Sequence, residues 1–146
     1  MNGDKVFFDT NIICYAYDSS EPEKRKVCER LLEKVFNGDI EGVISNQILG
    51  ETFNALVTKL GVSPEKARII VKSLIVSDKW RKLDYTSTTI DHAISNFEKF
   101  NAPFWDLLIS ETMKENGIIE IFTENDKDFD EISGITVTNP LRPLRK

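Results

Sequence analysis

The sequence lacks any long run of apolar residues. No apolar stretch approaches the roughly 20 residues that a helix needs to span a membrane, although 40% of the 146 residues are hydrophobic. The N-terminal segment 1–5 also lacks the positively charged and then apolar layout of a secretion signal. We therefore expect a cytoplasmic protein that makes no contact with a membrane.

Side chains that commonly act as nucleophiles or bases are scarce. His92 is the single histidine, and it falls off the apolar stripe of a predicted helix, so we expect it to be exposed to solvent. There is no Gly-x-Ser-x-Gly motif and no phosphate-binding P-loop. Cys14 and Cys28 form no metal-binding or redox motif and lie beside apolar residues, which is typical of core cysteines. A mechanism through a protein nucleophile is therefore not expected.

An excess of basic charge is also missing. The chain has 19 Lys and Arg against 24 Asp and Glu, which gives a net charge of −5 at pH 7. Proteins that bind nucleic acids usually present a basic face to the phosphates. Basic residues do cluster in the segments 24–30, 79–82 and 142–146, but such clusters are more often solvated surface. Charge therefore neither supports nor excludes RNA as a ligand.

The length and the hydrophobic pattern indicate a single α/β domain over residues 1–146. A chain of this length is close to the common size of one domain. Short apolar runs alternate with amphipathic segments, which is typical of a mostly parallel sheet with helices on both faces. Strands are predicted at 5–9, 40–45, 80–85, 118–123 and 135–138. Helices are predicted at 11–17, 21–36, 46–60, from 63 onward, at 87–100 and at 106–116.

Acidic residues fall where these strands end or where helices begin. Asp9 ends the first strand, and Glu51 lies early in the third helix. Asp106 opens the last helix, and Asp126 follows the fourth strand. Sites in α/β sheets form at that edge, and carboxylates gathered there repel one another unless a hard cation offsets their charge. The pattern predicts a site for Mg²⁺ or Mn²⁺, with Asp9 and Asp106 as metal ligands.

Such a site predicts a metal-dependent hydrolase. Without a protein nucleophile, a water molecule activated by the metal would attack a phosphodiester, and Glu51 would bind the ion through water or orient the attacking water. Each acid also has a simpler interpretation. Asp9, Thr10 and Asn11 are all good helix caps. Asp106 suits a helix N-terminus by its charge, and Glu51 alone is typical of a surface. The prediction depends on the acids occurring together at element boundaries.

The order of these residues resembles that of the PIN domain family. The segment 9–13, followed by 15–18 and 22–24, is similar to the opening of a PIN domain. Glu51 matches the single Glu of the family's second motif, and the segments 105–109 and 123–129 resemble the third and fourth motifs. The short chain resembles the VapC toxins of toxin–antitoxin pairs. The resemblance implies a three-layer α/β/α fold with about five strands, Mg²⁺- or Mn²⁺-dependent endoribonuclease activity, an antitoxin partner and a homodimer.

The fourth motif departs from the family's pattern, because Asn125, Asp126 and Asp128 all compete for one position. Asn125 offers a neutral carbonyl oxygen and Asp126 offers charge, so we place these two near the site. We expect Asp128 to turn outward or to cap the segment after Phe129. Four polar residues are expected to hold the carboxylates through hydrogen bonds. They are Thr10, Asn11, Thr123 and Asn125.

Three other functions fit parts of the sequence. An aspartyl-phosphate phosphatase also uses an Asp after the first strand, but it usually has a second Asp two residues on, where this chain has Asn11. A catalytically silent PIN-like interaction module would not need Asp9, Glu51 and Asp106. A DNA-directed nuclease would use the same metal site.

The third predicted helix carries apolar residues that suit either a partner or the core. They are Phe53, Leu56, Val57 and Leu60. If they are exposed, they would form a groove for an amphipathic helix of an antitoxin, whose basic side chain would enter the acidic site and compete with the metal. The same stripe also fits ordinary burial against the sheet.

Overall fold

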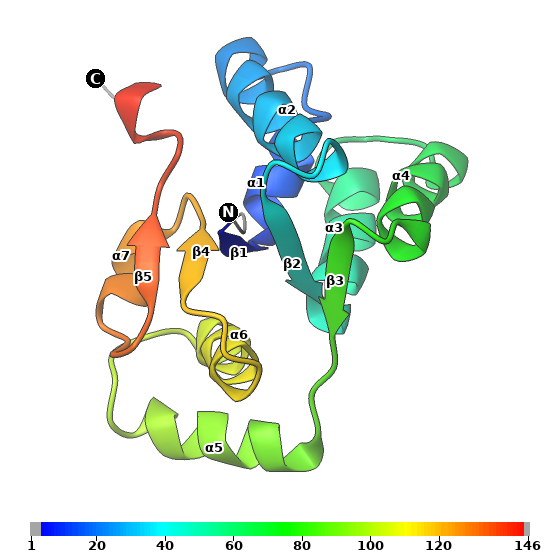
Figure 1. Ribbon diagram of the computed structural model, residues 1–146. Coiled ribbons are helices and arrows are strands. Elements are labelled where there is room, and N and C mark those ends of the chain that lie inside the picture. Colours follow the sequence, from blue (N-terminus) through cyan, green and yellow to red (C-terminus); the bar gives the residue numbers. More distant parts are fainter. Residues whose placement is uncertain (1–3, 145–146) are drawn as a thin grey trace.

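A parallel sheet with helices on both faces forms the centre of the molecule (Figure 1). The computed structural model describes residues 4–144. Within them all four strand pairs are parallel, in the order β3-β2-β1-β4-β5. The predicted α/β class and the five strands are confirmed. The strands are β1 (Lys5–Phe8), β2 (Glu41–Ser45), β3 (Trp80–Leu83), β4 (Glu120–Phe122) and β5 (Thr136–Thr138).

Each predicted helix is present, with ends that differ by a few residues, and one short helix was not predicted. Five residues do not complete two helical turns, so the hydrophobic period could not reveal α7. The described residues also end in a short 3₁₀ helix, η1 (Arg142–Leu144). The helices are α1 (Thr10–Tyr15), α2 (Pro22–Phe36), α3 (Asn46–Thr58), α4 (Pro64–Val76), α5 (Ser87–Phe97), α6 (Phe104–Glu115) and α7 (Asp126–Asp130). None of the helices in this described part of the chain is long and apolar enough to cross a membrane.

The order of the strands places a crevice at the carboxyl ends of β1 and β4. The chain runs from β1 to β3 in one direction across the sheet and then returns to the other side of β1 for β4 and β5. Since crossovers between parallel strands are right-handed, α1 to α4 cover one face and α5 to α7 the other. The contacts of α1 with α3, of α3 with α4 and of α5 with α6 agree with these two layers (Figure 1). Ligands bind α/β sheets where the order reverses in this way.

The core lies between the sheet and both helical layers. Phe8 packs edge-on against Trp80 and Phe122, with ring centroids 5.0 and 5.3 Å apart. Cys14 and Cys28 are buried free thiols, as expected for core cysteines. This packing holds β1, the strand that directly precedes Asp9, in the middle of the sheet.

Gly42 is expected to tolerate no side chain. A Cβ atom there would lie 2.6 Å from Val35 Cγ1 and 2.7 Å from Trp80 Cε3, both in the core. We predict that Gly42→Ala lowers the free energy of unfolding by about 1–3 kcal/mol, because overpacking forces neighbouring side chains to move. Denaturant titration measures the loss. Gly50→Ala is the control, since no atom lies within 4 Å of its Cβ position and Ala favours the helix, so this variant should be slightly stabilised.

Candidate active site

Asp9 joins the first strand to the first helix. It directly follows β1 and is the N-cap of α1, where its Oδ1 accepts a hydrogen bond from the Thr10 backbone N–H at 2.8 Å. Its Oδ2 accepts a hydrogen bond from Thr123 Oγ1 at 2.7 Å, which ties β1 to the end of β4. The side chain is only 6% exposed. The pKa of Asp9 is raised, and burial is the largest cause. The two hydrogen bonds act in the opposite direction, while the charges of Glu51 and Asp128 raise the pKa further. Asp9 is therefore both a helix cap and a carboxylate in an acidic environment.

Glu51 reaches the same place from α3. Its Oε1 accepts a hydrogen bond from Thr10 Oγ1 at 2.9 Å, and its Oε2 accepts one from Gln47 Nε2 at 3.1 Å. Thr10 thus contacts two carboxylates, Asp9 through its backbone and Glu51 through its hydroxyl group. The start of α3 is fixed directly at the end of β2. Ser45 is the last residue of β2 and also caps the helix by accepting a hydrogen bond from the Ile48 N–H. Glu51 is consequently half-buried and faces α1.

Asp106 contributes a third carboxylate from the first turn of α6. Its pKa is raised to about 7, chiefly by burial and then by the charges of Asp9, Asp128 and Glu51. A hydrogen bond between the Asp106 and Asp128 side chains adds to this rise. The expectation that Asp128 turns outward is therefore wrong. Asp128 lies in the first turn of α7, half-buried, and its charge acts on both Asp106 and Asp9.

Asp126 takes part in a different network. Its buried carboxylate pairs with the guanidinium group of Arg142 and accepts a hydrogen bond from Asn139 Nδ2 at 3.2 Å. These contacts fasten α7 to η1 and to the end of β5. The sequence did not reveal this role of Arg142, because the basic cluster at 142–146 was interpreted as solvated surface. Asp126 therefore faces the C-terminal segment, whereas its neighbour Asn125 lines the pocket described next.

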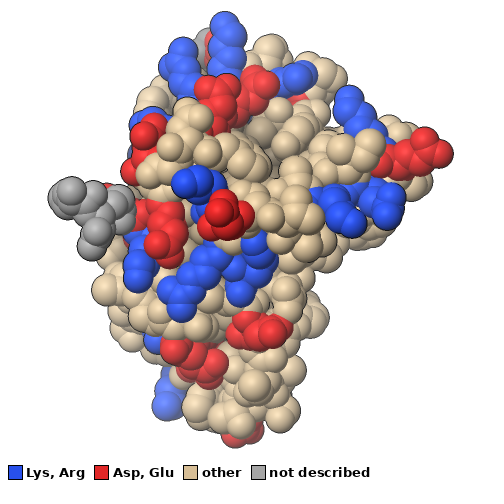
Figure 2. Space-filling model, turned by 45° about the vertical axis from the view of Figure 1, so that its right-hand side comes forward, with Lys and Arg blue, Asp and Glu red and all other residues tan. Residues whose placement is uncertain are grey.

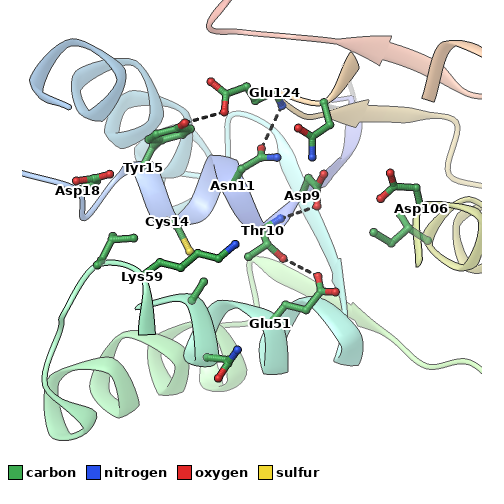
Figure 3. A pocket seen from close by; sticks show the side chains of 15 residues that line it. Asp9, Thr10, Asn11, Cys14, Tyr15, Asp18, Glu51, Lys59, Asp106 and Glu124 are labelled. Atoms are coloured by element: carbon green, nitrogen blue, oxygen red, sulfur yellow. Dashed lines mark hydrogen bonds between the residues drawn. The ribbon is translucent and has the colours of Figure 1, made fainter. Parts of the chain in front are cut away.

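A pocket of about 570 Å³ opens in front of the three carboxylates (Figure 3). Asp9, Glu51 and Asp106 come from three separate elements and point into it, together with Thr10 and Asn11. Thr10 and Thr123 bind carboxylates directly, whereas Asn11 and Asn125 make hydrogen bonds to other groups around the site. Asn11 Oδ1 accepts a hydrogen bond from the Glu124 N–H at 3.1 Å, and the Asn125 N–H donates one to Thr123 Oγ1 at 3.0 Å.

A further polar cluster at the edge of the pocket was not predicted as part of the site. Tyr15 Oη donates a hydrogen bond to Glu124 Oε1 at 2.6 Å, and Lys24 Nζ pairs with Glu124 Oε2 at 2.9 Å. Lys24 also lies over the Tyr15 ring, 4.8 Å from its centroid. The signal was present, because Tyr15 and Lys24 both fall in the segments that resemble the opening of a PIN domain. The cluster holds α1, α2 and the loop after β4 together.

The chemistry of these side chains suits a hard divalent cation. The donors are carboxylates, which Mg²⁺ and Mn²⁺ prefer, and a bound cation would offset the repulsion that raises the pKa of Asp106. Each oxygen of Asp9 and Glu51 that accepts a hydrogen bond retains a second lone pair. As the side chains stand within residues 4–144, no three His, Cys, Asp or Glu residues converge closely enough to hold one ion. The residues thus fit such an ion by donor type and by charge.

Without metal, the protein is expected to lose stability as the pH rises toward neutrality. Because the pKa of Asp106 is raised from 3.8 to about 7, the folded state binds more protons than the unfolded state between these values. The free energy of unfolding then falls as the pH increases through this window. Denaturant titrations in EDTA from about pH 5 to about pH 7.5 should show a smaller fall for Asp106→Asn than for the wild type. Parallel curves for the two proteins would contradict the assignment.

Comparison with known proteins now identifies the family. A model of the PIN domain family matches residues 6–135, so the chain belongs to that family. Its structural neighbours include VapC toxins of toxin–antitoxin systems. One is VapC20 of Mycobacterium tuberculosis, a sarcin–ricin loop cleaving toxin. It is 18% identical with a TM-score of 0.67, and the match covers 89% of this chain and 96% of that one. No curated protein matches the sequence significantly.

Two further neighbours were solved as complexes. One is VapBC2 from Rickettsia felis, bound to a DNA fragment from its promoter. The matched chain is 18% identical with a TM-score of 0.67, and the match covers 92% of this chain and 98% of the matched chain. DNA-bound VapBC from Salmonella typhimurium is 20% identical with a TM-score of 0.65, and the match covers 94% and 98%. At this identity the likeness shows a shared fold, which is the predicted PIN-like α/β/α fold.

Proposed function

We propose that this protein is a Mg²⁺- or Mn²⁺-dependent endoribonuclease and the toxin of a toxin–antitoxin pair. The observation that carries the proposal is the meeting of Asp9, Glu51 and Asp106, from three elements, in one pocket where the strand order reverses. A silent interaction module would not need carboxylates gathered in a site where burial, and then their mutual charge, raises their pKa values. The similarity to VapC20, a sarcin–ricin loop cleaving toxin, supports RNA as the substrate.

The side chains of the pocket would bind and orient the reactants. Asp9 and Asp106 would hold the cation, which when bound offsets negative charge on a phosphodiester and lowers the pKa of water. Thr10 and Thr123 fix the Asp9 carboxylate through its two oxygens. Glu51, whose two oxygens are already oriented by Thr10 and Gln47, would accept a hydrogen bond from the attacking water. This arrangement needs no nucleophile from the protein, in agreement with the exposed position of His92.

Asp128 is proposed as the fourth acid of the site in place of Asp126. It contacts Asp106, whereas Asp126 is engaged by Arg142 and Asn139. The two single variants, Asp128→Asn and Asp126→Asn, separate these roles. Asp128→Asn should reduce cleavage strongly with little effect on the melting temperature. Asp126→Asn should chiefly lower the melting temperature, because it weakens a buried charge-assisted network. The reverse pattern would favour Asp126 as the fourth acid.

The substrate class is tested with purified protein and labelled single-stranded RNA and DNA oligonucleotides of the same sequence. Cleavage of RNA should require Mg²⁺ or Mn²⁺ and should stop in EDTA. Cleavage of DNA alone would favour a DNA-directed nuclease. Release of inorganic phosphate from a phosphomonoester, without cleavage of either polymer, would favour a phosphatase.

The antitoxin partner is proposed from the neighbours that were solved as toxin–antitoxin complexes. The predicted groove on α3 is largely core, because Leu56 is buried and Val57 and Leu60 pack against the smaller core cluster. Phe53 remains 39% exposed. Expression of the chain in the cytoplasm should slow bacterial growth, and Asp9→Asn should relieve the effect. A wild type that is harmless at high expression would contradict the toxin role. Sedimentation of the purified protein tests the expected homodimer.

A further inference from the structure

We propose that Lys59 binds a backbone phosphate of the RNA beside the bond that is cleaved, and that the strand continues from there toward Lys66. The inference rests on the proposed ribonuclease function and names residues that would bind the substrate. It starts from the distribution of charge in the pocket. Lys59 is the one Lys or Arg among the described residues that line it, and it shares the pocket with the carboxylates of Asp9, Glu51 and Asp106.

Lys59 projects into the pocket from the end of α3. It is the C-cap residue of that helix, eight positions after Glu51, which corresponds to about 12 Å along the helix axis. Figure 3 shows its side chain extending between α1 and α3, past Cys14, with the amino group directed toward Thr10. The charge of Lys59 lowers the pKa of the Cys14 thiol, against the larger effect of burial. The ammonium group therefore stands beside the acidic centre without belonging to it.

The charge of Lys59 is not used by the fold. Among residues 4–144, Lys59 is in no ion pair, and its side chain is exposed. Lys24, also close to the pocket, differs in this respect, because Glu124 and Tyr15 engage its ammonium group at 2.9 and 3.3 Å. An exposed lysine next to a cluster of carboxylates is a suitable site for a phosphate, which needs a cation but must stay near the cleavage centre.

A second hollow extends this path. It has a volume of about 340 Å³, and Leu60 lines both hollows, so they are neighbours. Its lining includes Arg25, Lys66 and the half-buried ring of Tyr17. Arg25 is 3.7 Å from Glu29, whereas Lys66 forms no ion pair within the described chain. Basic side chains with an aromatic ring along a groove are typical of sites for single-stranded nucleic acid.

The overall charge of the molecule offers no simpler explanation for RNA binding. The net charge is −5, and Figure 2 shows a face on which basic and acidic side chains are interspersed. A general basic surface is thus not present on that face to attract phosphates. Positive charge instead lies on one side of the proposed cleavage centre, at Lys59 in the pocket and at Lys66 in the second hollow.

The test measures binding and cleavage of a short fluorescent single-stranded RNA. Fluorescence anisotropy in EDTA, where no cleavage is expected, compares the wild type with Lys59→Gln, Lys59→Arg and Lys66→Gln. Lys72→Gln, an exposed position of α4 that lines neither hollow, is the control. Lys59→Gln should weaken binding by roughly three- to tenfold and lower the slope of log K against log salt by about 0.7. Lys59→Arg should retain binding, Lys66→Gln should show a smaller loss, and Lys72→Gln should match the wild type.

Cleavage in Mg²⁺ or Mn²⁺ gives an independent measurement. Lys59→Gln should raise KM with a smaller effect on kcat, since it removes a contact to the bound strand and not to the reacting phosphate. Unchanged affinity and salt slope in Lys59→Gln would overturn the inference while leaving the ribonuclease proposal intact. If the wild type cleaves no RNA, the ribonuclease proposal fails, and the anisotropy series still decides whether Lys59 binds phosphate. A loss in Lys72→Gln equal to that in Lys59→Gln would mean that only general charge matters.

Discussion

Asp9→Asn and Asp106→Asn are each expected to abolish RNA cleavage while the protein remains folded. Loss of either carboxylate removes a proposed ligand of the cation, whose stabilisation of the transition state is worth several kcal/mol, so the rate should fall at least about 100-fold. The amide can keep the local structure. Asn is also a good N-cap, and at position 9 its amino group can donate a hydrogen bond to Thr123 Oγ1, which now donates to Asp9.

Stability and activity should therefore change in opposite directions. Removing one charge from a repelling cluster is expected to leave the melting temperature in EDTA unchanged or to raise it. Asp39→Asn is the matched control, because Asp39 is exposed and precedes β2, at the opposite edge of the sheet from the pocket. Cleavage assays and thermal unfolding on the same preparations make the comparison. Full activity in Asp9→Asn or Asp106→Asn, or unfolding of both variants, would remove the basis for the proposed site.

Mn²⁺ is expected to raise the melting temperature of the wild type much more than that of Asp9→Asn. An ion that binds only the folded state adds about 2.7 kcal/mol to stability at a concentration one hundred times its dissociation constant. For a chain of this length that corresponds to a rise of roughly 5–10 °C. The variant lacks one ligand and should show only a small part of the rise. Differential scanning calorimetry over a series of Mn²⁺ concentrations measures both effects.

The control for this experiment is again Asp39→Asn, which should follow the wild type at every Mn²⁺ concentration. Equal rises in the wild type and in Asp9→Asn would show that the ion binds elsewhere on the acidic surface. A rise that survives in Asp9→Asn but not in Asp128→Asn would move the metal site toward α7.

Much of the fold was predictable because each strand and each long helix carries its own hydrophobic period. Asp9 and Asp106 could be selected for a related reason, since they stand at the end of β1 and in the first turn of α6, and a parallel sheet brings such positions to one edge. Glu51 lies one turn further into its helix, α3. The helix α7 is too short to show a hydrophobic period. Which of its acids approaches Asp106 depends on how the loop after β4 packs against β5 and η1, and in the structure Asp128 contacts Asp106 whereas Asp126 pairs with Arg142.

The sequence by itself determined the succession of strands and helices along the chain and the three acids at or near their boundaries, because periodicity and position along an element are local properties. Only the tertiary structure decided which groups share a contact across long stretches of chain. The pairing of Arg142 with Asp126, the approach of Asp128 to Asp106 and the open position of Lys59 in the pocket belong to this second class. The physical reason is that a side chain's partner depends on the packing of elements far apart in sequence, which the hydrophobic pattern of either element alone does not contain.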